Sequence, residues 1–218
     1  LYTKIGNCPQ DICEGINEVF PDANIVTDVG QHQMWASQFI RLHKGQEFIT
    51  SGGLGTMGFG FPAAIGASVV APKKPTVLIT GDGGFQMNMQ EMATAMSEEI
   101  PVVICIFNNS NLGMVRQMQQ LFYGKRYKIT CLRRNIDCPD DCKGPQGKCP
   151  PYVPDFIKWA ESYGAMGIRV TDPTQIEDAL REAKANYKTT IIEFLIASDE
   201  LVLPMVKGGD AMSEMILK

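Results

Sequence analysis

The sequence predicts an α/β fold with three layers (α/β/α), in which a parallel sheet is covered by helices on both faces. Segments typical of strands alternate with segments typical of helices along most of the chain, as expected for strands joined by crossover helices. Glycine-rich turns follow several of the strand-like segments, at the positions where sheets of this class bind ligands. The 218 residues are enough to bury one full hydrophobic core. We therefore expect a single α/β domain over residues 1–218.

The expected elements rest on apolar periodicity. Residues 9–20 predict an amphipathic helix because Ile12, Ile16 and Val19 share one stripe. The helix at 59–70 consists mainly of small residues, and Pro62 lies in its first turn, where a missing N–H costs little. The tail from Asp199 onward is loop-like, with one helical turn near its end. In chain order, strands are expected at 24–27, 47–50, 76–80, 101–107, 165–170 and 189–196, and helices at 9–20, 31–39, 59–70, 85–97, 112–121, 154–163 and 173–186.

Composition and charge narrow the class of partner. The chain is 44% hydrophobic and carries a formal net charge of −4, which gives no electrostatic footprint for nucleic acid or for an anionic membrane surface. No apolar run reaches the length of a membrane span, and no basic-then-apolar leader opens the chain. We expect a cytoplasmic protein, or one of an organelle interior if its source is eukaryotic.

Two polar features at the ends of neighbouring strand patterns predict a metal-bridged diphosphate. Gly81-Asp82-Gly83-Gly84 follows strand 76–80 and opens a helical pattern, so its N–H groups suit a phosphate. Asp82 would repel that phosphate unless a divalent cation lay between them. Asn108-Asn109 ends the next apolar run, and carboxylate, amide, phosphate and water oxygens are the ligands that Mg²⁺ prefers. The plainer alternative is a turn in which Asp82 merely caps a helix.

A second phosphate motif competes with this interpretation. Residues 53–58 read Gly-Leu-Gly-Thr-Met-Gly and match the dinucleotide fingerprint G-x-G-x-x-G, with Asp82 at the position of a ribose-binding acid. However, 47–50 is a poor first strand, and an acid flanked by glycines suits a metal better than a ribose. We therefore favour the metal-bridged diphosphate over a dinucleotide site.

The seven cysteines fall into two groups. Cys8, Cys13 and Cys105 lie in apolar patterns and are expected to be small core residues. The others lie in a Pro-, Gly- and Asp-rich stretch at about 128–152, which predicts a flexible insertion. Their spacing lacks a close C-x-x-C pair, so a metal or iron–sulfur site, disulfides and reduced thiols all remain open. This loop group is Cys131, Cys138, Cys142 and Cys149.

Longer motifs give a more specific interpretation. They are TDVGQHQMW (27–35), TSGGLGTMGFGFPAAIG (50–66), GDGGFQMNMQE (81–91), NNSNLGMVRQ (108–117), PDFIKWAESY (154–163) and LPMV (203–206). In these the chain resembles the large, catalytic subunit of acetolactate synthase, from about Asn24 to its end except around 128–152. The resemblance implies the diphosphate-binding domain of a thiamine-diphosphate enzyme, with that family's fold and a role in branched-chain amino acid biosynthesis.

The resemblance also implies a metal and phosphate site. Asp82 and Asn109 would ligate Mg²⁺ through their side chains, and Asn111 through its backbone carbonyl. The N–H groups of Gly83 and Gly84 would hold the terminal phosphate of thiamine diphosphate.

Other positions match residues that contact the rest of the cofactor. Gln31 and His32 would contact the diphosphate. Met57 would bend the cofactor into a compact shape, and the Gly55 carbonyl and the Met57 N–H would bind the aminopyrimidine edge. Taken without the resemblance, His32 and Met57 would be read as ordinary helix-surface or core residues.

Substrate contacts are implied on the helix after the asparagines. Met114 and Val115 would line the pocket, although ordinary helix packing explains them equally well. Met118 departs from the family, in which a tryptophan at this position shapes the pocket for the second, acceptor 2-oxo acid. Because a flexible thioether fills space differently, the choice of acceptor is open.

The implied site lacks one half. In this family a glutamate from a separate pyrimidine-binding domain, usually of a neighbouring subunit, activates the cofactor, and nothing before Asn24 matches that domain. We therefore expect no catalytic residue of this kind in the chain, a pyrimidine-domain partner, a homo- or hetero-oligomer, and a 2-oxo acid such as pyruvate as substrate. Alternatives are a subunit of a split 2-oxo acid decarboxylase and a non-catalytic module that binds cofactor or metal.

Overall fold

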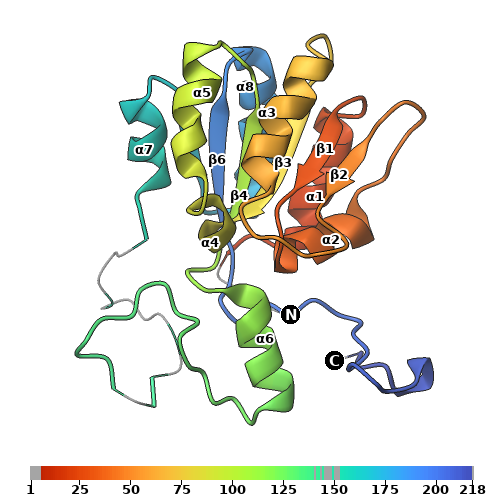
Figure 1. Ribbon diagram of the computed structural model, residues 1–218, viewed down its shortest axis with the longest axis vertical. Coiled ribbons are helices and arrows are strands. Elements are labelled where there is room, and N and C mark those ends of the chain that lie inside the picture. The colour runs from red at the N-terminus through yellow and green to blue at the C-terminus, as the bar shows by residue number, and fades with distance from the viewer. Residues whose placement is uncertain (1–5, 140, 143, 145–148, 150–152, 218) are drawn as a thin grey trace.

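The structure is a computed structural model that describes residues 6–139, 141–142, 144, 149 and 153–217. Within these residues, six parallel strands form one sheet in the order β2-β1-β3-β4-β6-β5 (Figure 1). The α/β class, the three layers and the parallel sheet are therefore confirmed. The strands are β1 (Asn24–Thr27), β2 (Phe48–Thr50), β3 (Thr76–Gly81), β4 (Val103–Asn108), β5 (Met166–Val170) and β6 (Thr190–Leu195).

The helices lie close to their expected positions and cover both faces of the sheet (Figure 1). Two clusters of buried side chains show which helix packs on which face: α1, α2 and α8 contribute to one, and α3, α5 and α7 to the other. The helices are α1 (Pro9–Val19), α2 (Gln31–Phe39), α3 (Gly60–Val70), α4 (Asp82–Phe85), α5 (Met92–Ser97), α6 (Gly113–Phe122), α7 (Phe156–Ser162) and α8 (Ile176–Asn186), with short 3-10 turns η1 (Met89–Glu91), η2 (Pro173–Gln175) and η3 (Met212–Glu214).

The central strands are buried on both faces. In β4, Cys105 and Phe107 belong to the cluster under α1 and α8, whereas Ile104 and Ile106 belong to the opposite cluster. This alternation is the two-residue period of a strand. Each such side chain contributes about 1.5–3 kcal/mol when it is fully removed from water, so the two clusters hold the strand ends firmly in place.

The prediction of a single helix at 85–97 is wrong. The chain instead forms α4, η1 and α5, and α4 begins at Asp82 rather than at Phe85. The break occurs at Asn88, which has a non-helical backbone (φ −138°, ψ 26°) and whose side-chain amide donates a 2.7 Å hydrogen bond to the carbonyl of Gly58. A tertiary contact with a distant loop therefore overrides the local helical preference.

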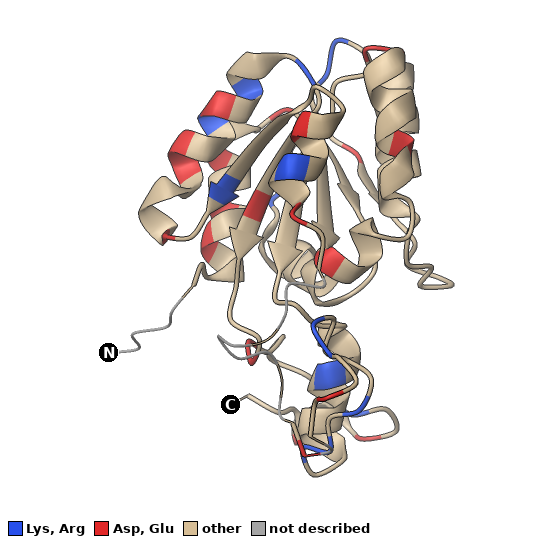
Figure 2. Ribbon diagram, turned by 90° about the vertical axis from the view of Figure 1, so that its left-hand side faces the viewer, with Lys and Arg blue, Asp and Glu red and all other residues tan. Residues whose placement is uncertain are grey.

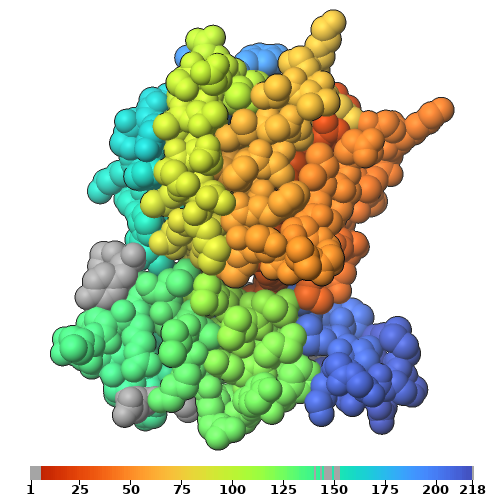
Figure 3. Space-filling view, in the orientation of Figure 1, coloured from red at the N-terminus to blue at the C-terminus, as the bar shows by residue number. Residues whose placement is uncertain are grey.

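The carboxyl ends of the strands form the edge of the sheet that matters for function. The chain leaves β1 toward β2 but returns to β3 on the other side of β1, which makes the β1–β3 boundary a switch point where such sheets bind ligands. α6, residues 123–139 and the C-terminal tail lie beyond this edge, below the sheet in Figure 1 and at the bottom of the molecule in Figure 3.

Charged residues of both signs are distributed over the helices. Figure 2 shows lysines and arginines mixed with aspartates and glutamates along the helices. Within the described residues, no helix has both the length and the apolar character that crossing a bilayer requires, and the cytoplasmic location stays a prediction. Part of the insertion expected at 128–152, namely residues 140, 143, 145–148 and 150–152, lies outside the described residues.

Candidate functional site

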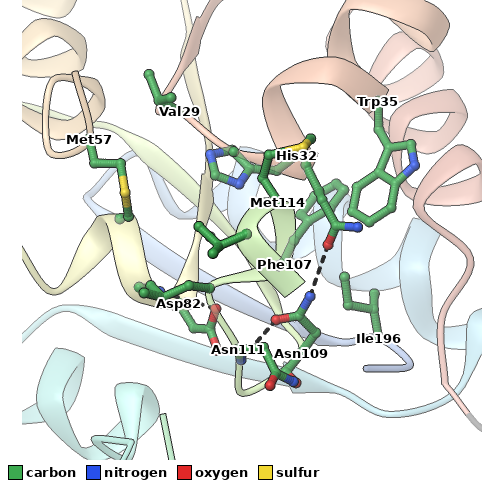
Figure 4. Close-up of a pocket in the computed structure, with 18 residues that line it drawn as sticks. Val29, His32, Trp35, Met57, Asp82, Phe107, Asn109, Asn111, Met114 and Ile196 are labelled. Carbon is green, nitrogen blue, oxygen red and sulfur yellow. Dashed lines mark hydrogen bonds between the residues drawn. The ribbon is translucent and has the colours of Figure 1, made fainter. Parts of the chain in front are cut away.

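A cavity of about 60 Å³ lies at the carboxyl edge, between the segments that follow β1, β3 and β4 (Figure 4). The enclosed space is small, so a ligand larger than a few water molecules would lie across its open side. Of the expected site residues, Gly55 and Met118 do not line the cavity. Those that do are Gln31, His32, Met57, Asp82, Gly83, Gly84, Asn109, Asn111, Met114 and Val115.

Asp82 is a buried carboxylate that lacks a full set of partners. Its side chain is 2% exposed, and Oδ1 accepts a 3.0 Å hydrogen bond from the N–H of Gly83. Oδ2 has no hydrogen-bond partner within the described residues. Burial raises the pKa of Asp82 to about 7, against the lowering effect of backbone hydrogen bonds. A carboxylate in this position is stabilised by a bound cation.

The turn after β4 carries the two asparagines toward Asp82 (Figure 4). Asn109 Oδ1 accepts a 3.0 Å hydrogen bond from the N–H of Asn111, and Asn111 Nδ2 donates to the Asn109 carbonyl at 2.7 Å. Ser110 between them has a positive φ of 57°. Asn111 Oδ1 is buried and has no partner among the described residues. Two orphaned buried oxygens, on Asp82 and Asn111, therefore line one cavity.

Glu193 supports this turn from the neighbouring strand and was not anticipated. Its carboxylate is 2% exposed and accepts hydrogen bonds from Asn108 Nδ2 and Arg169 Nε, both at 2.6 Å. Asn108 Oδ1 in turn accepts from the N–H of Ser110 at 2.9 Å. The signal available in the sequence was one acidic residue in β6, a strand with no other charged residue.

His32 is a buried, neutral imidazole at the start of α2. Burial lowers its pKa to about 4, although the charge and a backbone hydrogen bond of Asp28 act in the opposite sense. Two glycines leave room for the ring: a Cβ at Gly30 would lie 2.9 Å from His32 Cε1, and one at Gly81 would lie 2.8 Å from His32 Nδ1. Nε2 is buried with no partner in the described structure. The ring therefore offers one unused nitrogen at the cavity.

Asp28 fastens the loop that carries Gly55 and Met57, a role that the sequence did not reveal. Its carboxylate accepts the N–H of Gly58 at 3.0 and 3.1 Å and the N–H of Gly60 at 2.8 Å. A Cβ at Gly84 would lie only 2.5 Å from Asp28 Oδ1. Gly84 is therefore required for the close approach of the loops after β1 and β3.

Gln31 is placed at the cavity, but its amide is already engaged by the protein. Nε2 donates to Gln117 Oε1 at 2.8 Å and to the carbonyl of Glu200 at 2.9 Å, while Oε1 accepts from Asn109 Nδ2 at 3.2 Å. A Cβ at Gly113 would lie 2.1 Å from Gln31 Oε1. In this structure Gln31 orients Asn109 and ties it to α6 and the tail.

Apolar side chains form the remaining wall. Met114 is half-buried and packs on the core, whereas Val115 is exposed. Met57 reaches the cavity from the loop after β2 (Figure 4), and its Cε would lie 3.9 Å from a Cβ at Gly83. Gly55 has a positive φ of 61°, which favours glycine there.

Of the three cysteines expected in the core, two are buried there and one is not. Cys13 and Cys105 are fully buried in the core, and burial raises the pKa of Cys13 to about 12. Cys8 is only half-buried, since it precedes the first turn of α1 at the edge of the core.

The strand order excludes the dinucleotide reading. That reading needs the strands before residues 53–58 and before Asp82 to be adjacent, as in a βαβ unit. In the sheet, β1 lies between β2 and β3, and β2 is an edge strand of three residues. Asp82 therefore belongs with the switch point and not with the glycine loop of a dinucleotide site.

Comparison with known proteins agrees with this geometry. Residues 28–194 match the family described as thiamine pyrophosphate enzyme, C-terminal TPP binding domain. The chain is 43% identical to an acetolactate synthase of Mycobacterium bovis and 44% identical to an acetolactate synthase large subunit of Corynebacterium glutamicum, each over 94% of this chain and 31% of the relative. It is 43% identical to a probable acetolactate synthase large subunit of Methanococcus aeolicus, over 99% of this chain and 34% of the relative.

The chain thus spans about a third of the length of these curated relatives. The family match covers most of the described strands and both loops that carry the orphaned oxygens. The parallel fold and the switch-point cavity agree with this family match. The chain therefore belongs to the thiamine pyrophosphate enzymes, as their C-terminal TPP-binding domain.

Proposed function

We propose that this domain binds thiamine diphosphate through Mg²⁺, held by the carboxylate of Asp82 and by oxygens of Asn109 and Asn111. The observation that carries the proposal is that Asp82 and Asn111 line the same cavity and each has a buried side-chain oxygen without a partner among the described residues, Oδ2 and Oδ1 respectively. One carboxylate with amide oxygens fits Mg²⁺, which keeps phosphate and water as its remaining ligands. The Asn109 oxygen accepts one hydrogen bond and retains a second lone pair.

The remaining site residues suit an anion and a bent cofactor. The N–H groups of Gly83 and Gly84 would hold the terminal phosphate. His32 contributes a neutral nitrogen to the diphosphate, and Gln31 keeps Asn109 in position. The loop fastened by Asp28 would present the Gly55 carbonyl and the Met57 N–H to the aminopyrimidine.

The proposed reaction is decarboxylation of a 2-oxo acid such as pyruvate, with transfer of the remaining carbon unit to a second 2-oxo acid. Thiamine diphosphate, when bound, supplies the electron sink for this chemistry. Met114 and Val115 would exclude water from one side of the substrate. Met118, half-buried one helical turn beyond Met114, would influence acceptor choice from outside the cavity. A decarboxylase that releases the aldehyde is the second candidate, which the departure from tryptophan at Met118 leaves open.

The site needs a second half to work. Leu54, on the loop beside the cavity, is 94% exposed, and such an apolar side chain suits an interface. We propose that a pyrimidine-binding domain, on the same polypeptide or on a partner in an oligomer, covers this loop and supplies the activating glutamate.

The experiment compares the chain alone with a chimera in which these 218 residues replace the corresponding domain of the Methanococcus aeolicus relative. With pyruvate, Mg²⁺ and thiamine diphosphate, we expect negligible turnover by the chain alone and formation of acetolactate by the chimera. The chimera carrying Met118→Trp tests acceptor choice. Acetaldehyde without acetolactate would favour the decarboxylase, and turnover by the chain alone would contradict the half-site.

A further inference from the structure

A row of buried side-chain amides connects the C-terminal tail to the Asn109–Asn111 turn. Its members are Asn109, Gln31 and Gln117, each 8% exposed or less and each hydrogen-bonded to the next. At its far end, Gln117 on α6 exchanges two hydrogen bonds with the backbone of Val202 in the tail. The proposed function gives Gln117 no role.

The backbone of Val202 fixes the direction of the Gln117 amide. The N–H of Val202 donates to Gln117 Oε1 at 2.8 Å, and the carbonyl of Val202 accepts from Gln117 Nε2 at 3.0 Å. A backbone N–H can only donate and a carbonyl can only accept. A flipped Gln117 would therefore place donor against donor and acceptor against acceptor, which is unfavourable because these groups are buried.

This direction passes from Gln117 through Gln31 to Asn109. Gln117 Oε1 also accepts from Gln31 at 2.8 Å, so the Gln31 atom at this contact must be Nε2. The Glu200 carbonyl, 2.9 Å from the same nitrogen, favours the same direction. Gln31 Oε1 then faces Asn109 and can accept only from its Nδ2, at 3.2 Å. The Asn109 oxygen is therefore turned toward the N–H of Asn111 (Figure 4).

The direction of the Asn109 amide matters to a cation because its two ends carry opposite partial charges. The oxygen is a proposed Mg²⁺ ligand, whereas an NH₂ group in its place would repel the ion. The N–H of Asn111 favours the same direction from the other side. Each of the two constraints thus supplies part of the orientation, and loss of the one from Gln117 should weaken cation binding without abolishing it.

We propose that Gln117 is a positioning residue for the cation site, which takes its direction from the tail backbone at Val202 and passes it through Gln31 to Asn109. This inference rests on the proposed function, because it concerns the oxygen that Asn109 would offer to Mg²⁺. It makes the tail part of the cation site, although the described residues after Ile196 do not line the cavity.

The test measures the Mg²⁺ concentration that gives half-maximal binding of thiamine diphosphate by the full chain. Gln117→Met introduces a side chain of similar length without an amide. We expect this Mg²⁺ midpoint to rise by about 10-fold, the lower end of the effect of outer-shell partners in metal sites. Gln117→Glu keeps an acceptor oxygen in either protonation state, so its midpoint should return close to that of wild type.

Two controls separate positioning from a general loss of stability. Val19→Ala removes buried apolar volume in α1, outside the cavity, and lowers stability without altering the amide row. Gln38→Met removes an exposed contact with the tail, a 3.4 Å hydrogen bond to the Leu203 carbonyl. Both variants should keep the wild-type Mg²⁺ midpoint. The unfolding midpoint of every variant is measured without ligands.

Equal Mg²⁺ midpoints for Gln117→Met and wild type would overturn the inference and leave the proposed function intact. A midpoint raised equally in Gln117→Met and Gln117→Glu would also overturn it, as would a midpoint that rises in Val19→Ala in step with lost stability. Absence of Mg²⁺-dependent binding by the wild-type chain would instead overturn the proposed function, and this inference with it.

Discussion

Asn108 donates a 2.6 Å hydrogen bond from its side-chain amide to the buried carboxylate of Glu193. The second oxygen of Glu193 is paired with Arg169, which also contacts Asp155 at 2.7 Å. Asn108 then binds the N–H of Ser110. A chain of charged and amide groups thus runs from the surface to the turn that carries the expected metal ligands, and it fixes that turn without touching the cavity.

Replacing Glu193 with Gln tests this support. A glutamine offers only one acceptor oxygen, so either Asn108 or Arg169 loses its partner in a buried position. We expect the free energy of unfolding to fall by about 1–3 kcal/mol, with weaker Mg²⁺-dependent cofactor binding. Chemical denaturation and calorimetry measure the two effects. The matched control is Glu177→Gln, in the exposed pair with Arg181, which should change stability by less than about 0.5 kcal/mol. Equal effects of the two substitutions would refute this role.

Replacing Gly84 with Ala tests the close approach of the loops that follow β1 and β3. The added Cβ would lie 2.5 Å from Asp28 Oδ1, so the loop held by Asp28 must shift. We expect a loss of about 1–3 kcal/mol in unfolding free energy. Gly66→Ala, inside α3 where a Cβ meets nothing within 4 Å, should instead stabilise the protein by up to about 1 kcal/mol. If Gly84→Ala lowered the unfolding free energy no more than Gly66→Ala does, the contact between Gly84 and Asp28 would be shown to be unimportant.

The buried His32 predicts a pH dependence of stability. Its pKa is about 4 in the folded protein and about 6.5 in an unfolded chain, so the unfolded state binds the proton first as the pH falls. The contribution of His32 to the unfolding free energy should therefore decline from pH 6.5 down to pH 4, by about 3 kcal/mol in total. Asp82, whose pKa is raised to about 7 in the folded protein, contributes in the opposite sense over this range, so the effect of His32 is the difference between the profiles of wild type and variant. His32→Asn should remove most of this decline, and His43→Asn, at an exposed position, should leave it unchanged. Equal pH profiles for wild type and His32→Asn would contradict the assignment.

Much of the fold could be predicted because its signals are local and repeated. The alternation of strand and helix patterns identified the parallel sheet, and β-branched runs placed β3 and β4 within a few residues. The break at Asn88 could not be predicted, because it depends on a hydrogen bond to Gly58, thirty positions away. Local periodicity carries no information about such a contact.

The site residues likewise divide into those that local sequence features predict and those that depend on tertiary contacts. Asp82, Asn109 and the glycines after β3 could be predicted to meet at one cavity, because a ligand-binding turn needs those residue types at strand ends. The supporting residues Asp28 and Glu193 were missed as such, since a buried acid is indistinguishable from a surface acid until its partners are known. The engaged amide of Gln31 likewise depends on three segments that meet only in the folded chain.

The most direct measurement is calorimetric titration of the chain with thiamine diphosphate, with and without Mg²⁺, for wild type and Asp82→Asn. Because the Asp82 carboxylate is buried and half unpartnered, the amide variant should be at least as stable as wild type, so lost binding cannot reflect unfolding. We predict Mg²⁺-dependent binding by wild type and by the exposed-site control Asp210→Asn, and none by Asp82→Asn. Normal Mg²⁺-dependent binding by Asp82→Asn would contradict the metal bridge.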